Sequence, residues 1–179
     1  MGSWTIWHFV AVIAVALVAA WSANKSKAGP TATGYGGWLI ALSLFLLFWA
    51  AQELAEFYRV KTLIGVLMPS ALQNPDYLEY IVYAKSLAWL EAILLAACAG
   101  LLAISRARWT VKAIVAVLWL AGPICAAIEF TLAESYFGEY LLEKDYSALA
   151  ATTLFATIGT WYLATSKRVK NTYRGRQAR

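Results

Sequence analysis

A long apolar run that ends in carboxylates constrains this chain most. Between Trp38 and Ala51 the sequence carries no ionisable group, and Glu53, Glu56 and Arg59 follow closely. Such a run is typical of a membrane helix with polar groups near one bilayer face, because about 20 apolar residues span the hydrocarbon core. Hydrophobic residues make up 61% of the chain and charged residues 14%, against roughly 45–50% and about 25% in soluble domains. The sequence therefore predicts an all-α integral membrane protein.

Five segments are predicted to span the membrane. The first, Trp4 to Trp21, is followed by Lys25 and Lys27. This charge order favours a retained helix with its N-terminus outside over a cleaved signal peptide, which carries its positive charge before the apolar run. The other four spans are expected over residues 38–56, 78–104, 109–128 and 147–163. We therefore expect three regions: an N-terminal helix and connector (1–33), a four-helix unit (34–173) and a basic tail (174–179).

Several local features predict how these spans are shaped and packed. The apolar stretch from Thr62 to Leu72 is too short to span and contains Pro69, so we expect it to lie along the membrane interface. Gly122 and Pro123 predict a kink in the fourth span. Trp89 and Trp119 lie far from the span ends and are expected to pack between helices. A close helix contact is predicted at three small residues spaced four apart, Ala92, Ala96 and Gly100.

The distribution of charge predicts the orientation. With the N-terminus outside, the inner segments hold eleven Lys and Arg residues and no acid. The outer segments hold nine acids against four basic residues, and the tenth acid, Glu91, lies within a span. Because cytoplasmic loops retain Lys and Arg, this asymmetry predicts an outside N-terminus and an inside C-terminus. The last four spans would keep this orientation if the first were cleaved.

Acidic residues within the spans are the candidate functional groups. With a rise of about 1.5 Å per residue, Glu53 lies roughly 22 Å and Glu91 roughly 20 Å from the inner ends of their helices. Intramembrane carboxylates are costly and usually face the bundle interior, where they pair, bind a cation or carry protons. The predicted intramembrane polar site consists of Glu53, Glu56, Glu91, Glu129 and His8.

A structural role for the same carboxylates is the competing hypothesis. Glu53 and Glu56 would pair with Arg59 or Lys85, and Glu91 would bond to Trp, Tyr or Thr groups, so that the cluster would only fix helix register. A metal site is not predicted, because His8 is the only histidine and no ligand spacing typical of a metal is present. No cofactor is predicted, although the polar site could hold the head of a lipid or a quinone.

The basic C-terminal segment predicts contact with the membrane surface. Lipid head groups are expected to contact Lys167, Arg168, Lys170 and Arg174. A simple topology signal would explain the same residues. The basic residues are split among several short segments rather than gathered on one face, so a nucleic-acid partner is not predicted.

Two motifs carry a resemblance to a known family. The sequence GYGGWLIAL begins at Gly34, and SKRVKNTY ends at Tyr173. Together they resemble the domain-of-unknown-function family numbered 2569, small bacterial inner-membrane proteins with a Gly-Gly-Trp-Leu start to the first helix, here Gly36 to Leu39, and a basic exit from the last. The resemblance implies a four-helix architecture and an inner-membrane location, but no activity. The helix before Gly34 departs from that pattern.

These observations favour three functional hypotheses in order. The first is a non-catalytic accessory or structural subunit of a larger inner-membrane complex, because catalytic motifs are absent and small and aromatic residues are abundant; a homo-oligomer is included. The second is a small transporter or a lipid- or quinone-binding protein that uses the carboxylates for protons, cations or polar head groups. A membrane enzyme comes third, since no nucleophile or metal site is recognisable.

Overall fold

The computed structural model describes residues 17–18, 21, 34–138 and 146–173. The described residues from 34 onward are almost entirely helical and contain no strand. Four stretches are long and apolar enough to cross a membrane: Trp38–Leu67, Pro75–Ile104, Arg108–Phe137 and Ser147–Thr165. The predicted four-helix unit is therefore confirmed, and the chain is a multi-pass membrane protein. The predicted first helix, Trp4 to Trp21, lies almost wholly outside the described residues.

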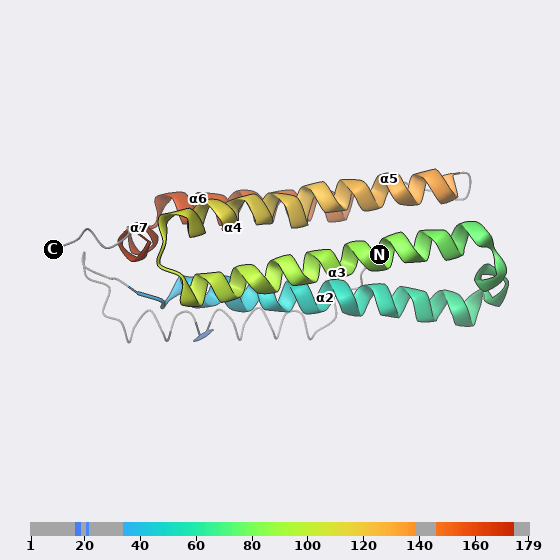
Figure 1. The fold of residues 1–179 in the computed structure, drawn as a ribbon, viewed down its shortest axis with the longest axis horizontal. Helices are drawn as coiled ribbons and strands as arrows, with labels where there is room; N and C mark the ends of the chain where they lie inside the picture. Colours follow the sequence, from blue (N-terminus) through green and yellow to red (C-terminus); the bar gives the residue numbers. More distant parts are fainter. Residues whose placement is uncertain (1–16, 19–20, 22–33, 139–145, 174–179) are drawn as a thin grey trace.

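The helices form two layers (Figure 1). One layer is an antiparallel hairpin of α2 (Trp38–Leu67) and α3 (Pro75–Ile104), joined by the short 3-10 helix η1 (Pro69–Gln73). The other layer contains a second antiparallel pair. One member is the continuous helical rod formed by α4 (Arg108–Trp119), η2 (Leu120–Ile124) and α5 (Cys125–Phe137), and the other is α6 (Ser147–Thr165). The short helix α7 (Lys167–Thr172) follows α6.

The first hairpin is longer than the sequence predicted. Residues Thr62 to Leu67 continue α2 instead of lying along the interface, and η1 begins only at Pro69. Helix α3 begins at Pro75, where the Asn74 side chain accepts a hydrogen bond from the Asp76 backbone N–H. Each helix has 30 residues, about 45 Å at 1.5 Å per residue. This length exceeds the hydrocarbon core of about 30 Å, so the helices extend beyond it.

The helical rod of α4, η2 and α5, which corresponds to the predicted fourth span, does not end at Pro123. Gly122 and Pro123 lie in η2, a π-helical segment, where the sequence predicted a kink. A π-helical turn is a common way to accommodate a proline, which has no N–H to donate. The helix then continues as α5 to Phe137, so Glu129 lies within a helix rather than in an acidic connector.

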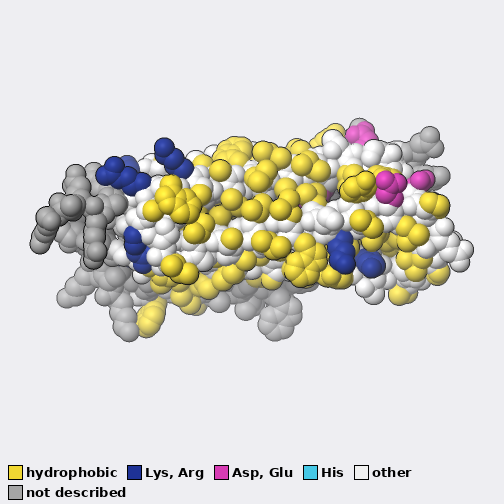
Figure 2. All heavy atoms as spheres, viewed as in Figure 1, with side chains coloured by type: hydrophobic (Ala, Val, Ile, Leu, Met, Phe, Trp, Pro, Cys, Tyr) yellow, Lys and Arg dark blue, Asp and Glu magenta, His cyan; other side chains and the backbone are white. Residues whose placement is uncertain are grey.

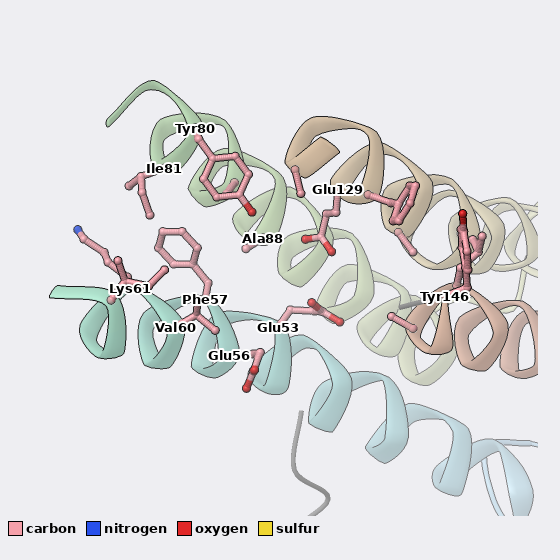
Figure 3. Close-up of a pocket in the computed structure, with 17 residues that line it drawn as sticks. Glu53, Glu56, Phe57, Val60, Lys61, Tyr80, Ile81, Ala88, Glu129 and Tyr146 are labelled. Atoms are coloured by element: carbon pink, nitrogen blue, oxygen red, sulfur yellow. The ribbon is translucent and has the colours of Figure 1, made fainter. Parts of the chain in front are cut away.

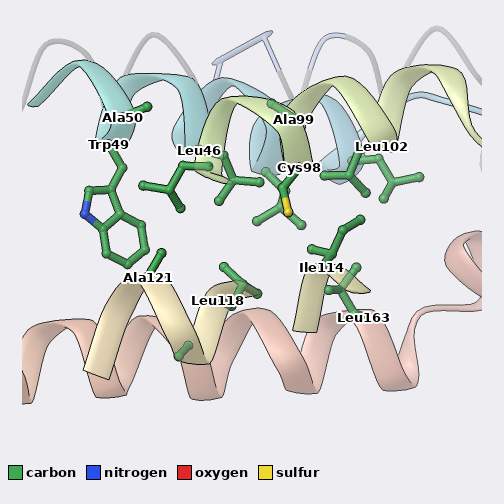
Figure 4. Packing of buried hydrophobic residues seen from close by; sticks show 14 of the residues in the cluster. Leu46, Trp49, Ala50, Cys98, Ala99, Leu102, Ile114, Leu118, Ala121 and Leu163 are labelled. Carbon is green, nitrogen blue, oxygen red and sulfur yellow. The ribbon is translucent and has the colours of Figure 1, made fainter. Parts of the chain in front are cut away.

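The core lies between the two layers, where side chains of α2 and α3 meet those of α4 and α6 (Figure 4). Its most buried members include Leu46, Leu95, Leu102, Ile114, Leu118 and Leu163. The predicted packing of Trp89 between helices is wrong, because this residue is 43% exposed. Trp119 is 38% exposed but connects α4 to α6, since it donates a hydrogen bond to Thr160 Oγ1 at 3.1 Å.

The small-residue stripe does not form a close helix contact among the residues that the structure describes. Ala92 is buried, but Ala96 is exposed and a Cβ on Gly100 would meet nothing within 4 Å. The close approach occurs elsewhere: a Cβ on Gly159 of α6 would lie 3.0 Å from Leu118 Cδ1. The α4 and α6 helices therefore meet at a glycine that the spacing pattern did not identify.

The described charges are segregated along the bundle axis. We call the end where α3 leads into α4 the basic end, which carries Arg106, Arg108, Lys112, Lys167, Arg168 and Lys170 and no described acid. All described acids lie in the opposite part, the acidic half: Glu53, Glu56, Asp76, Glu79, Glu91, Glu129 and Glu134. Figure 2 shows basic side chains without acidic ones at one end, acidic side chains together with further basic ones toward the other, and hydrophobic side chains between them. The basic residues of the acidic half are Arg59, Lys61 and Lys85.

At the basic end, α7 packs against the start of α2. Thr172 Oγ1 accepts a hydrogen bond from the Gly34 backbone N–H at 2.9 Å, and Tyr173 Oη donates to the Leu102 carbonyl at 2.6 Å. Gly34 and Gly37 have φ angles of 85° and 58°, which glycine adopts without strain. The turn into α2 therefore requires these glycines, and Thr172 ties it to the C-terminal segment.

Candidate functional site

A cavity of about 320 Å³ opens in the acidic half, between the two helix pairs. Its lining comes from α2, α3, α5 and the start of α6 (Figure 3). Acidic, basic and aromatic side chains among the lining residues are Glu53, Glu56, Glu129, Lys61, Phe57, Tyr80, Phe130 and Tyr146, and most of the rest are alanines and branched aliphatic residues. The cavity is therefore apolar with a few charged groups, as ligand sites usually are.

Glu53 is held by a tryptophan one turn earlier on α2. Trp49 Nε1 donates a hydrogen bond to Glu53 Oε1 at 2.6 Å. The Trp49 ring is 9% exposed and meets Phe155 of α6 edge to face, with centroids 5.2 Å apart. The same ring also lies against Gly122 of η2, where a Cβ would come within 3.2 Å of Trp49 Cη2. The π-helical segment thus provides the space in which Trp49 orients Glu53.

Glu91 is the most buried carboxylate. Its side chain, on α3, is 3% exposed, and Oε1 has no hydrogen-bond partner among the described residues. It lies three residues beyond Ala88, which lines the cavity, and so about 4.5 Å further along the α3 axis. The buried thiol of Cys125, on α5, lies beside its carboxyl group. Glu91 therefore lies further along α3 than the cavity wall, toward the basic end, and is not itself a lining residue.

Glu129 completes the cluster from α5. Figure 3 shows the carboxyl groups of Glu53 and Glu129 directed into the same space from facing helices. The three carboxyl groups of Glu53, Glu91 and Glu129 are close enough to interact electrostatically with one another. Three helices thus bring together three of the five predicted site residues.

The remaining predicted residues have other positions. Glu56 lines the cavity margin and forms a salt bridge with Arg59, one turn away on α2. Figure 3 shows Glu56 directed away from Glu129. Lys85 makes no salt bridge with any described residue. His8 lies outside the described residues, so its predicted place in the site stays a prediction.

The predicted head-group residues lie at the opposite end of the bundle. Lys167, Arg168 and Lys170 belong to α7, and Lys167 and Lys170 are exposed. Arg174 lies outside the described residues. These residues are separate from the carboxylate cluster, and lipid contact remains a prediction for them.

Sequence analysis missed the residues that shape the cavity. Trp49 precedes Glu53 by four residues, a spacing that places both on one helix face. The same spacing continues through Phe57 and Lys61, both of which line the cavity. Phe130 and Tyr146 carried no comparable signal, because they come from different helices. Cys125 is buried and lies beside Glu91, a neighbour that its position in an apolar run does not reveal.

The donor set does not form a metal centre. Across the described ranges, no group of three or more His, Cys, Asp or Glu side chains is arranged to hold a metal ion.

Comparison with known proteins identifies the family but no solved relative. No curated protein and no solved structure matches the chain. The family model described as "Protein of unknown function (DUF2569)" matches residues 32–174. This range begins just before Gly34 and ends just after Tyr173, so it contains both the carboxylate cluster and the packed basic end. The chain belongs to the DUF2569 family.

Proposed function

We propose that this membrane protein binds a cation in the cavity of the acidic half, through the negative charge of Glu53, Glu91 and Glu129. The single observation that carries the proposal is the environment of Glu91. This residue is only 3% exposed, and one of its carboxyl oxygens has no hydrogen-bond partner although two other carboxyl groups lie nearby. An ionised carboxylate in the membrane interior is costly unless a positive charge balances it. A bound cation or a proton supplies that balance.

The described basic residues do not supply it. Arg59 is paired with Glu56 on the outer part of α2. Lys61 is two helical turns beyond Glu53, about 12 Å along the axis, and Figure 3 shows its amino group at the far end of the cavity from Glu129. Cation binding is the chemistry of the second sequence-based hypothesis, a small transporter or binding protein. Exchange of the cation for protons at the carboxylates would let binding be reversed.

Thermal unfolding of the purified protein tests the proposal. Inorganic and organic chlorides are added at constant ionic strength, in detergent and in an amine-free buffer. At least one cation should raise the midpoint saturably, because a ligand at 100 times its Kd stabilises by about 2.7 kcal/mol. The Glu53→Gln/Glu91→Gln variant should fold and lose this response.

A charge-matched control separates site binding from general screening. Asp76 and Glu79 are exposed acids of the same half that do not line the cavity. The Asp76→Asn/Glu79→Gln variant makes the same change in net charge and should keep the full response. Equal responses in the two double variants, or no saturable response in the wild type, would refute cation binding at this site.

The accessory-subunit hypothesis is kept as a second candidate because of one surface feature. Ala96 is exposed and Gly100 half-buried on α3, and a Cβ on Gly100 would meet none of the described residues within 4 Å. Small residues of this kind allow another helix to approach closely in a membrane. Purification in mild detergent tests this hypothesis. A co-purifying partner lost on Gly100→Leu substitution would support it, and a strictly monomeric protein without a partner would contradict it.

The proposed location is a bacterial inner membrane with the basic end in the cytoplasm. Six of the nine described Lys and Arg residues lie at that end without any described acid, which supports this orientation, since positively charged segments are retained inside. A reporter protein that works only in the cytoplasm should be active when it is fused after Arg179, and one that works only in the periplasm should be inactive there. Activity of a periplasmic reporter at the same position would reverse the orientation.

A further inference from the structure

Resting on the proposed cation site, we propose that its occupant is an organic ammonium ion with an apolar body. The ammonium group lies between the carboxylates of Glu53 and Glu129, and the apolar body lies against the aromatic and aliphatic lining. The cavity of about 320 Å³ is at the lower end of the range for small-molecule sites, about 300–1,000 Å³. It therefore fits a small amine better than a bulky ligand.

The charge arrangement favours an ammonium group over a coordinated metal. Glu53 and Glu129 face one space from α2 and α5 (Figure 3), but the described acids do not converge as metal ligands. An ammonium ion presents up to three N–H donors in different directions. It can therefore donate to carboxylates on two helices without the short, fixed distances that a metal requires.

Aromatic rings surround the same space. Figure 3 shows Phe57 and Tyr80 on the side of the cavity toward the α2–α3 turn and Tyr146 on the other side. Phe130 lies beside Tyr146, with ring centroids 5.0 Å apart. Ring faces attract organic cations, and the attraction grows when water is excluded. Because hydrated inorganic ions gain little from such rings, the lining selects for an organic cation.

Glu91 adds negative charge beneath this site. Glu91 follows Ala88 of the cavity wall by three residues on α3, about 4.5 Å along the axis, has one unpartnered buried oxygen, and interacts electrostatically with both Glu53 and Glu129. It strengthens the attraction for a positive ligand without itself lining the cavity. A neutral ligand of the same shape would leave this cluster unbalanced, so the positive charge is the feature that the site recognises.

The experiment uses n-hexylammonium chloride as the probe. Binding to the wild-type protein is measured by isothermal titration calorimetry in phosphatidylglycerol nanodiscs and phosphate buffer, both of which lack amines. The expected result is saturable binding that n-hexanol, the neutral counterpart, does not compete. The Glu53→Gln/Glu129→Gln variant should bind about tenfold more weakly or worse, a difference of about 1.4 kcal/mol. The Asp76→Asn/Glu79→Gln variant should bind like the wild type.

A second pair of variants isolates the aromatic contribution. Phe57→Leu and Phe130→Leu keep an apolar side chain but remove the ring, and each should weaken n-hexylammonium binding about threefold. Circular dichroism and thermal unfolding identify any variant that fails to fold. Unchanged n-hexylammonium affinity in both folded leucine variants would overturn the aromatic part of the proposal.

The outcomes also separate this proposal from the cation site on which it rests. Carboxylate-dependent stabilisation by potassium or magnesium chloride, without n-hexylammonium binding, would overturn the ammonium proposal and leave the cation site intact. Absence of any carboxylate-dependent binding would overturn both. Two kinds of occupant carry an ammonium group, a lipid head group and a free amine. Weaker probe binding in phosphatidylethanolamine nanodiscs would identify a lipid head group as the occupant, and equal binding in both lipids would assign a free amine.

Discussion

The basic end and the acidic half of the bundle treat their buried polar groups differently. At the basic end, the Thr172 hydroxyl is bonded to Gly34 and the Tyr173 hydroxyl to the Leu102 carbonyl, while Ser105 Oγ and Thr110 Oγ1 lie 2.6 Å apart. In the acidic half, Glu91 Oε1 and Tyr77 Oη are both buried without a described hydrogen-bond partner. Buried polar groups are normally satisfied. The basic end is therefore a structural closure, whereas the acidic half retains unused hydrogen-bonding capacity, as a binding site does.

The largest expected effect comes from breaking the packed end. Leu102 is 0% exposed, and truncation by Leu102→Ala should lower the free energy of unfolding by about 2–3 kcal/mol through the cavity it leaves. Ile104→Ala removes a similar side chain from the same helix at a position 84% exposed, and should cost less than about 0.5 kcal/mol. Denaturant unfolding in detergent checks both values. Equal losses would show that the basic end is not the packed region inferred here.

A smaller effect is expected where packing meets the site. Gly122→Ala places a methyl group 3.2 Å from Trp49 and 3.5 Å from Thr152, which should cost about 1–3 kcal/mol by overpacking. The gain in helix propensity, about 1 kcal/mol, is too small to offset this cost. Displacement of Trp49 should also loosen its bond to Glu53 and weaken n-hexylammonium binding.

Gly100→Ala is the matched control for that substitution. A Cβ there meets nothing within 4 Å, so the same propensity gain should appear as a small stabilisation, with ligand affinity unchanged. Thermal unfolding and calorimetry measure the two quantities for both variants. A stabilised Gly122→Ala protein with unaltered binding would break the inferred connection between the π-helical segment and Glu53.

The smallest effect concerns one hydrogen bond at the basic end. Tyr173→Phe removes the donor to the Leu102 carbonyl and should cost about 1 kcal/mol at neutral pH. Burial raises the pKa of Tyr173 to about 12, above the value of about 10 in an unfolded chain. The stabilisation is therefore fully present below about pH 10 and lost as the pH rises through about 12. Comparison of wild-type and Tyr173→Phe unfolding across this range checks the sign, because the difference should shrink only at the alkaline end.

Much of the architecture follows from the sequence because the membrane restricts the choice. Apolar runs must satisfy their backbone groups internally, so the predicted spans at residues 38–56, 78–104, 109–128 and 147–163 all correspond to helices. Their ends were predicted less well. The extension of α2 through Leu67 and of α5 through Phe137 lies beyond the hydrocarbon length that a hydropathy pattern records.

The candidate site was only partly predictable for a related reason. Counting residues along helices placed Glu53 and Glu91 at one depth, since helix rise is nearly constant. It could not decide which helix faces which, and the partnership of Trp49, Gly122 and Cys125 with these carboxylates depends on that choice. The small-residue stripe shows the same difficulty, because spacing indicated Ala96 and Gly100 whereas the close contact involves Gly159.

The sequence by itself determined a multi-pass helical membrane protein, an uneven charge pattern and the two motifs that begin at Gly34 and end at Tyr173, because each depends on local composition or spacing. Tertiary structure decided that these motifs meet at one end, with Gly34 bonded to Thr172 across 138 positions of the chain. It also brought Glu53, Glu91 and Glu129 together from α2, α3 and α5. Such contacts depend on the order of the helices in the bundle and on the rotation of each helix about its axis. Side-chain packing between helices fixes that order and rotation, so the sequence of a single helix does not encode them.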